Sequence, residues 1–373
     1  MGERKILNAI SVDIVGPYPP IIGGTASFLS RLVPMLEIHG VSCDVLNTQR
    51  GDSKQGLRDR LARLFFFTFL AWKILFSKSE IVHCHAGNWA NLIGNTIVLA
   101  IGRLSGKALV LTLHSGGILL KLNKYARFGK LIFRIPHVIT TVTPELCEMV
   151  SKFGNKNVYF VPNGLTYLPN AEEMNQPIPE QTAHFMKNHE PCIVTVGAME
   201  PIYGIDVLIL AMPQLLATFP NLGLVVIAYK YADKQYQAKI ANLLDSLNLN
   251  NYVFFPDSLP SVPAVVKGAD VFVRSTIADG DSIAVREALA LEVPVVVSNV
   301  GYRPEGTLQF NSGDHLHLAA KIKDVLTAPI NQRTDSSDAG KRTTLEYIKF
   351  YGMAKSKLED AKAKRHHFTA RWH

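Results

Sequence analysis

The stretch Asp279-Gly-Asp-Ser-Ile-Ala-Val-Arg-Glu287, continuing into Ala288-Leu-Ala-Leu-Glu-Val-Pro-Val-Val-Val-Ser298, decides the fold of this 373-residue chain. Its first part reads as a loop that enters a short helix, and its second part ends in the β-branched run of a buried strand. The junction between loop and helix suits anionic and hydroxylated ligands. Free backbone N–H groups there attract phosphate oxygens, and carboxylates accept hydrogen bonds from hydroxyls.

The same alternation of apolar strand-like runs with helical patterns fills both halves of the chain, as in doubly wound α/β proteins. In the first half we expect strands at Ile6–Val15, Val41–Leu46, Ile81–Cys84, Ala108–Leu113, Val138–Val142 and Val158–Val161. In the second half we expect them at Ile193–Val196, Leu224–Ala228, Val253–Phe255, Val271–Val273 and Val295–Val297. Helices are expected at Thr25–His39, Ile205–Phe219 and Lys234–Leu247, with a loop at Gly197–Gly204.

A chain of this length exceeds one ordinary core, so we expect two domains with a ligand between them. Residues 1–165 are predicted to form the first domain and 191–344 the second. Residues 166–190, rich in Pro, Asn, Gln and Glu, are predicted to link them. A helix over about 345–373 is expected to pack back on the first domain.

Composition excludes several classes of protein. The four cysteines are scattered without a CxxC pair, which indicates reduced thiols in a cytoplasmic protein and neither a disulfide frame nor a zinc site. From the start of the sequence we expect no signal peptide, and no apolar run has the length of a membrane span.

The positive charge is concentrated in the first half. Residues 1–165 hold 19 Lys and Arg against 9 Asp and Glu, whereas the remainder holds 20 against 22. The segments Lys54–Lys78 and Lys121–Arg134 combine basic residues with apolar, partly aromatic runs, which suits a helix in an anionic membrane interface. The alternative is a core helix beside a solvated basic face. No nucleic-acid-binding motif accompanies the charge, so we do not expect nucleic acid as a partner.

Glycines and histidines follow several predicted strands. Gly23 and Gly24 come between the first strand and the first helix, where glycine lets backbone N–H groups approach a diphosphate. Their spacing is not GxGxxG, which argues against a nicotinamide or flavin enzyme. His114 follows another strand and is a candidate for the ligand site. His83 and His85 are expected to point in different directions, one toward the site and the other into the core. His83 and His114 can each also be a structural histidine.

Asp279-Gly-Asp281 has the form of a DxD metal motif, but its place late in the chain and before a helix fits that use poorly. We expect no metal and no cofactor.

Together these residues resemble the GT-B glycosyltransferases, specifically the retaining family 4. The resemblance is carried by Gly23-Gly24, His114, Val161-Pro-Asn-Gly164, Val196-Gly-Ala-Met-Glu-Pro-Ile-Tyr-Gly204, and the acid-x7-Glu pattern of Asp279 and Glu287. It implies two Rossmann-like parallel-sheet domains that face each other across a cleft. It also implies metal-free transfer of a sugar from a nucleotide-diphosphate donor, with retention of configuration.

The resemblance also assigns roles. Asp279 would hold hydroxyls of the donor sugar, Glu287 would bind the ribose, and His114 would line the reaction centre. The donor site would further include Gly23, Gly24, Gly197, Gly280, Asp281, Ser282 and Ile283. No side chain is an evident nucleophile, so we expect an oxocarbenium-like transition state in which the leaving diphosphate helps to deprotonate the acceptor.

Two cations usual in this family are replaced here by Ala198 and Tyr203, and they normally neutralise the leaving diphosphate. The acid at 279 is Asp where Glu is commoner, Ser282 replaces a frequent Gly, and Tyr229-Lys230 replaces expected glycines. Arg274, Arg303 and Lys230 each follow or end a predicted strand. We expect Arg274 or Arg303 to supply the missing charge.

We therefore expect a glycosyltransferase of cell-surface polysaccharide or lipopolysaccharide assembly, acting on a lipid-linked saccharide from the cytoplasm or the inner membrane face. The alternatives are an inactive sugar-nucleotide-binding scaffold subunit, favoured by Ala198 and Tyr203, and a GT-B sugar-nucleotide epimerase.

Overall fold

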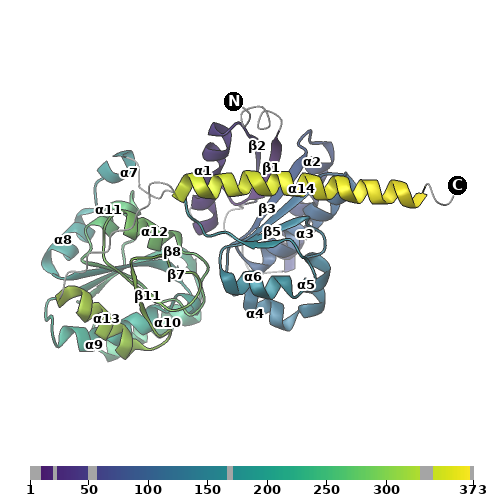
Figure 1. Cartoon of the computed structure of the whole chain (residues 1–373). Coiled ribbons are helices and arrows are strands. Elements are labelled where there is room, and N and C mark those ends of the chain that lie inside the picture. The colour runs from purple at the N-terminus through teal and green to yellow at the C-terminus, as the bar shows by residue number, and fades with distance from the viewer. Residues whose placement is uncertain (1–9, 20–22, 49–56, 166–170, 328–338, 370–373) are drawn as a thin grey trace. The chain divides into compact units, whose positions relative to one another are not determined.

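A computed structural model describes residues 10–19, 23–48, 57–165, 171–327 and 339–369, and divides the chain into two compact units (Figure 1). The first unit comprises residues 1–165 together with 337–373, and the second comprises 166–336. The strand expected at Ile6–Val15 begins outside the described residues. Its described part is the strand β1, Ser11–Gly16.

The first unit is built on a six-stranded parallel sheet in the order β2-β1-β3-β4-β5-β6. Its strands are β1, β2 (Ser42–Asn47), β3 (Ile81–Ala86), β4 (Ala108–Leu113), β5 (Val138–Thr141) and β6 (Val158–Phe160). Its helices are α1 (Gly24–Ile38), α2 (Leu57–Phe76), α3 (Trp89–Leu104), α4 (Gly117–Lys124), α5 (Ala126–Ile132), α6 (Pro144–Ser151) and α14 (Ala339–Thr369). The central strands β3 and β4 are buried along their whole length, as in a sheet that helices cover on both faces.

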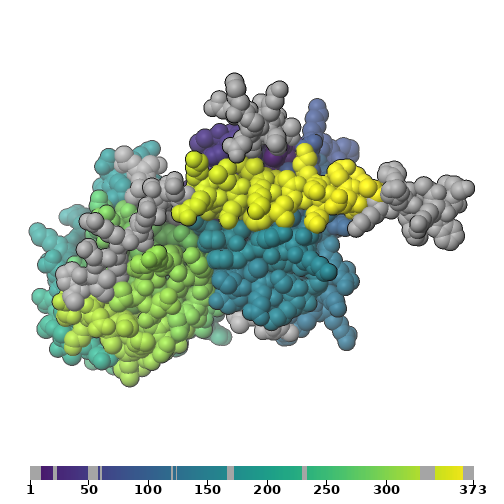
Figure 2. Space-filling view, in the orientation of Figure 1, coloured from purple at the N-terminus to yellow at the C-terminus, as the bar shows by residue number. Residues whose placement is uncertain are grey.

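Successive residues of β3 point to opposite faces of this sheet. Val82 and Cys84 enter a core that α2 to α6 complete, whereas His83, between them, contacts Tyr351 of α14. Helix α14 packs on β3, β4, β5 and α1 while its other side stays on the surface (Figure 2). The last helix of the chain therefore closes one face of the first unit.

The second unit has a parallel sheet in the order β12-β11-β10-β7-β8-β9. Its strands are β7 (Cys192–Met199), β8 (Gly223–Ala232), β9 (Val253–Phe254), β10 (Val271–Arg274), β11 (Val295–Ser298) and β12 (Thr307–Phe310). Its helices are α7 (Ala171–Asn175), α8 (Glu180–Asn188), α9 (Ile205–Leu216), α10 (Lys234–Ser246), α11 (Val262–Lys267), α12 (Ile283–Ala290) and α13 (His315–Thr327), with a 3-10 turn η3 at Pro201–Tyr203. Val273 and Phe272, adjacent in β10, enter separate cores on the two faces of the sheet.

The predicted class of fold is confirmed, and two local predictions are wrong. The loop expected at Gly197–Gly204 begins later, because Gly197 and Ala198 continue the ladder of β7 with β8. Part of the stretch expected to link the domains forms α8, whose Phe185 packs into a core of the second unit. Residues 166–170 of that stretch lie outside the described part of the chain.

Candidate functional site

The candidate site lies where the winding of the second sheet reverses. Strand β7 has β8 on one side and β10 on the other, and open α/β sheets bind ligands beyond the carboxyl ends of strands at such a reversal. Arg274, the last residue of β10, bridges the two strands there. Its Nη1 donates a hydrogen bond to the carbonyl oxygen of Val196 in β7 at 2.7 Å.

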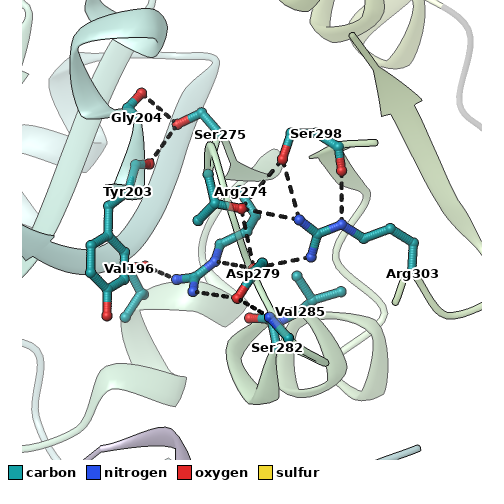
Figure 3. A network of polar contacts seen from close by, with 12 residues as sticks. Val196, Tyr203, Gly204, Arg274, Ser275, Asp279, Ser282, Val285, Ser298 and Arg303 are labelled. Atoms are coloured by element: carbon teal, nitrogen blue, oxygen red, sulfur yellow. Dashed lines mark hydrogen bonds and ion pairs between the residues drawn. The ribbon is translucent and has the colours of Figure 1, made fainter. Parts of the chain in front are cut away.

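Arg274 also forms a two-pronged ion pair with Asp279, drawn in Figure 3. Its Nε lies 3.1 Å from Oδ2 of Asp279, and its Nη2 lies 3.3 Å from Oδ1. This arrangement fixes the plane of the guanidinium as well as its distance, since two parallel donors face two acceptors.

Arg303, in the loop after β11, reaches the same carboxylate from another direction. Its Nη1 lies 3.1 Å from Oδ2 of Asp279, and its Nε donates to the carbonyl oxygen of Ser298 at 2.8 Å. Its Nη2 contacts the hydroxyls of Thr276 and Ser298 at 3.0 and 3.2 Å. The Arg303 side chain is 2% exposed, against 12% for Arg274. Arg303 therefore makes its contacts inside the protein, and Arg274 is the arginine that borders solvent.

Arg274, Arg303, Asp279, Thr276 and Ser298 form what we call the arginine cluster. Burial alone would raise the pKa of Asp279, but the charges and hydrogen bonds of both arginines hold it well below its ordinary value. Two guanidinium groups against one carboxylate leave the cluster with one net positive charge.

Tyr203, which stands where the family has a lysine, packs on Arg274. The guanidinium carbon lies 5.0 Å from the centre of the Tyr203 ring, a cation–π distance. The ring in turn covers Gly197, where an added Cβ would come within 2.5 Å of it. Gly197 therefore makes room for a ring that supports Arg274.

Gly301 brings the Arg303 loop against the Asp279 loop. Its φ of 72° is rare for other residues, and an added Cβ would collide with the carbonyl oxygen of Gly280. The next residue, Tyr302, donates its backbone N–H to that same oxygen at 2.9 Å. The glycine thus sets the approach that lets Arg303 reach Asp279.

Asp281 does not share a site with Asp279. It forms its own two-pronged pair with Arg286, at 2.8 and 2.7 Å, and Arg286 lies over the ring of Tyr302 at 5.8 Å. Asp279 thus faces Arg274 and Arg303, whereas Asp281 faces Arg286. Within the described ranges, no three His, Cys, Asp or Glu side chains gather as a metal would require.

The other predicted donor-site residues of this unit lie at the start of α12. Ser282 caps the helix, its hydroxyl accepting from the backbone N–H of Val285, and Ile283 begins the first turn. Glu287 lies one turn after Ile283 and is half-buried. The structure thus brings Asp279, Asp281, Ser282 and Glu287 onto one loop and helix start.

In the first unit, His83, His85, His114, Thr112 and Tyr351 form what we call the histidine cluster. The expectation that His83 and His85 point in different directions is wrong, because residues two apart in a strand share a face. Their ring centres lie 3.9 Å apart and both side chains are fully buried. His83 contacts the Tyr351 hydroxyl at 2.9 Å and that of Thr112 at 2.7 Å.

His114, after β4, continues this cluster toward the strand ends. Its Nε2 lies 2.9 Å from Nδ1 of His85, and 9% of His114 is exposed. Burial lowers the pKa of His114 to about 3 and that of His83 likewise to about 3, and it lowers that of His85 well below its ordinary value. All three rings are neutral at pH 7.

Gly23 and Gly24 lie at the start of α1. Gly24 is exposed, and an added Cβ on Gly23 would meet no atom within 4 Å, so the protein leaves the space beside this residue open. The backbone of Lys230 lies in β8, and its side chain is outside the described residues.

Sequence reasoning missed Thr276, Ser298 and Arg286. A signal was present for Ser298, a polar residue that ends a wholly apolar strand at the edge where ligands bind. Arg286 lies within the stretch from Asp279 to Glu287, but its ion pair with Asp281 was not predicted.

The fold is that of the GT-B glycosyltransferases. Residues 179–343 match the family described as glycosyl transferases group 1. An uncharacterized glycosyltransferase of Methanocaldococcus jannaschii is 22% identical over 237 residues, which are 63% of this chain and 56% of that relative. The match therefore spans little more than half of the relative's length.

Solved structures share the fold over nearly the whole chain. The HepE protein of Anabaena, in complex with UDP, has a TM-score of 0.63 at 13% identity, with 95% of this chain and 100% of that one covered. Sucrose-phosphate synthase of Thermosynechococcus elongatus has 0.65 at 18%, covering 97% and 100%. Trehalose 6-phosphate synthase of Burkholderia multivorans has 0.68 at 12%, covering 96% and 100%.

Proposed function

We propose that this protein transfers a sugar from a nucleotide-diphosphate sugar to a hydroxyl of an acceptor saccharide, with retention of anomeric configuration. The observation that carries the proposal is Arg274, held at the reversal point of the sheet in a cluster with one net positive charge. Similar structures support the donor class, since HepE was solved with UDP and with UDP-glucose.

Arg274 would act on the leaving group. As the bond from the anomeric carbon to the diphosphate breaks, negative charge builds on the diphosphate oxygens, and a fixed guanidinium stabilises it without reorganising. The acceptor oxygen bonds to the anomeric carbon on the face that the diphosphate leaves, and its proton passes to a diphosphate oxygen.

Other roles follow from the resemblance alone. We assign Glu287 to the ribose, the backbone N–H groups at Ser282 and Ile283 to the diphosphate together with Gly23 and Gly24, and His114 to the reaction centre. No metal is assigned, because Asp279 and Asp281 are each committed to arginines and Arg274 supplies positive charge.

The acceptor is proposed to be lipid-linked and reached at the cytoplasmic face of an anionic membrane. None of the helices in the described ranges is both long and apolar enough to span a bilayer. Helix α2 buries Phe67, Leu70 and Ile74 and turns a second apolar stripe outward. The exposed side chains of that stripe are Leu61, Leu64, Phe65, Phe69, Trp72, Leu75 and Phe76, between 48% and 72% accessible.

Basic side chains accompany this stripe, which is why an anionic lipid surface is the proposed occupant. Lys73 lies within α2 and Lys78 just beyond it, and both are exposed. Helices α4 and α5 expose further lysines and arginines at Lys121, Lys124, Arg127 and Lys130. Aromatic groups enter the lipid interface while basic groups meet the phosphates.

The donor is tested with a thermal-shift panel of UDP-, GDP- and ADP-sugars, followed by a transfer assay with the sugar nucleotide that binds. A ligand that binds only the folded state raises the melting temperature by mass action. Stabilisation by one nucleotide class with sugar transfer supports the proposal. Stabilisation without any transfer points to the scaffold subunit, and no response to any donor contradicts both.

The membrane step is tested by flotation with vesicles of phosphatidylcholine, with and without 30% phosphatidylglycerol. The wild-type protein should float with the anionic vesicles, and the double variant Trp72→Ser with Phe76→Ser should not. Ile38→Ser with Leu316→Ser is the matched control, because those side chains are exposed but lie on other helices. Flotation of the Trp72 and Phe76 variant equal to that of the control would remove α2 as the contact.

A further inference from the structure

We infer that Asp279 is a positioning residue, which orients Arg274 toward the donor diphosphate and does not bind the donor sugar. This inference rests on the proposed nucleotide-sugar reaction and departs from the role that the resemblance assigns to the acid at this position.

The carboxylate of Asp279 is already filled by donors from the protein. Oδ1 accepts from Arg274 Nη2 at 3.3 Å and from the backbone N–H of Gly280 at 3.0 Å. Oδ2 accepts from Arg274 Nε at 3.1 Å, Arg303 Nη1 at 3.1 Å and the Thr276 hydroxyl at 3.2 Å. A carboxylate offers about four lone-pair sites, so five donors leave no place for a sugar hydroxyl. The side chain is also only 10% exposed.

Those contacts hold the Arg274 guanidinium from three sides. Asp279 grips the edge formed by Nε and Nη2, the Val196 carbonyl accepts from Nη1, and the Tyr203 ring lies against its face. Figure 3 shows Arg274 between Tyr203 and Asp279. A long arginine side chain loses much rotamer freedom when it is fixed in this way, and that cost is met before any diphosphate binds.

Arg303 serves as the second support of the same carboxylate. Four of its contacts, to Asp279, Thr276 and both the hydroxyl and the carbonyl of Ser298, lie inside the protein. It balances the buried carboxylate from the side opposite solvent. The chain of contacts therefore runs from Ser298 through Arg303 and Asp279 to Arg274, which is the member that borders solvent.

The same scheme accounts for the replaced family cations. Tyr203 cannot neutralise a diphosphate, but its ring packs on an arginine that can. Ala198 continues β7 beside the Val196 carbonyl that holds Arg274. Arg274, from the neighbouring strand, supplies the positive charge that is absent at these two positions. Asp279 orients the Arg274 side chain.

Three probes of the same base separate the two roles of Asp279: the nucleoside monophosphate, the nucleoside diphosphate and the nucleotide-diphosphate sugar. Their dissociation constants are measured by calorimetry for the wild type and for Asp279→Asn. A positioning role predicts that Asp279→Asn weakens the diphosphate and the sugar nucleotide by the same factor, about tenfold, and the monophosphate by much less. In an Arg274→Gln background, Asp279→Asn should add less than a twofold further loss, because it acts through Arg274.

Selective weakening of the sugar nucleotide, with diphosphate affinity unchanged, would overturn the inference and return Asp279 to the sugar. Additive losses in the Arg274→Gln background would overturn it as well. A wild type that binds none of the probes would contradict the proposed function itself.

Asp324→Asn, which alters an exposed aspartate paired with Lys321 in the same unit, is the matched control. Asp279→Glu keeps the charge and should recover part of the diphosphate affinity, and circular dichroism verifies that every variant is folded at the assay temperature.

Discussion

The histidine cluster of the first unit and the arginine cluster of the second both lie on buried central strands of parallel sheets, the first along β3 and β4 and the second at and beyond the ends of β10 and β11. The histidine cluster is neutral, because burial lowers the pKa of His83 and His114 to about 3. The arginine cluster is ionised throughout, with Asp279 kept charged by Arg274 and Arg303. Taking an ion out of water costs several kcal/mol even after relaxation, whereas neutral rings that share hydrogen bonds avoid that cost.

The difference in charge between the two clusters indicates which kind of ligand each unit suits. A cluster of two arginines and one carboxylate, with Arg274 bordering solvent, is suited to an anion, and perturbed ionised groups are typical of functional sites. Neutral, buried histidines that share hydrogen bonds suit a site without a strong charge. Four changes break or sharpen this contrast, and we order them by the size of the expected effect.

Asp279→Ala should destabilise the second unit by about 3–5 kcal/mol, because two arginines lose the carboxylate that compensates them. The measurement is urea unfolding followed by circular dichroism. Trp72 and Trp89 lie in α2 and α3 of the first unit, so the unfolding transition that their fluorescence reports should move little.

Two substitutions set the scale for that result. Thr112→Val, which removes a neutral hydrogen-bond partner of His83, should cost about 1–3 kcal/mol and should appear in tryptophan fluorescence. Asp324→Ala, at an exposed ion pair, should cost less than about 1 kcal/mol. Equal losses for Asp279→Ala and Asp324→Ala would mean that the arginine cluster is not electrostatically coupled.

Arg274→Gln should lower the rate of sugar transfer by about 10²–10³-fold, the range seen when one fixed donor to a developing charge is removed. The loss should fall mainly on kcat, since the charge builds up in the transition state. Steady-state kinetics with the donor found by thermal shift measures it. Lys239→Gln, at a lysine of the same unit 59% exposed and paired with Asp206, should stay within twofold of the wild type. A comparable loss in both variants would contradict a specific role for Arg274.

His114→Gln should flatten the pH dependence of the first unit's stability. The folded-state pKa of His114 is about 3 and its ordinary value is 6.5, so between these limits the unfolded chain binds a proton that the folded chain does not. Stability therefore falls as pH falls through this window, by about 1.4 kcal/mol per pH unit for each such histidine. Urea unfolding by tryptophan fluorescence between pH 6 and 4 should show a slope smaller by about that amount in the variant.

The pKa of Asp279 is lowered as well, so its contribution to stability is also lost as pH falls, but in a lower pH window than that of His114. Asp279 has a lowered pKa as an acid, so its contribution is fully present above about pH 4 and is lost only below it. For the His114 prediction, the contradicting result is a pH dependence of stability between pH 6 and 4 that is the same in His114→Gln as in the wild type. It would mean that His114 is protonated in the folded state.

Tyr203→Leu should weaken diphosphate binding about two- to thirtyfold, because a cation–π contact contributes about 0.5–2 kcal/mol. Calorimetry with the nucleoside diphosphate measures it. The same substitution at Tyr302, whose ring lies under Arg286, is the matched control and should leave the affinity unchanged. Equal effects of the two would mean that the ring under Arg274 has no special role.

The fold was largely predictable because buried parallel strands appear as continuous apolar runs. The strand predicted at Ala108–Leu113 has the observed bounds of β4, and the helix predicted from Ile205 begins where α9 does. The strand β12 was not predicted, since its sequence alternates polar and apolar residues at the edge of the sheet. The predicted end of a strand was wrong where the strand continues through a glycine, as β7 does at Gly197.

In the site, the need for a cation led to Arg274 and Arg303, but their shared partner was not predicted. Asp279 and Arg303 lie 24 residues apart, and only the turn at Gly301 brings them together. Tyr203 was interpreted as a lost lysine because packing against Gly197 cannot be read from spacing. The placement of His83 and His85 was predictable from the two-residue period of a strand alone.

Helix α14 carries a consequence for how the protein is made. The first unit is interrupted by the second in chain order, and its sheet is covered by the fully buried Tyr347 and Tyr351 of the final helix. A ribosome therefore releases every residue of the second unit before it releases the segment that completes the first. During synthesis one face of the first sheet stays uncovered until α14 has been made. Loss of chaperones and premature termination should therefore affect the first unit more severely than the second.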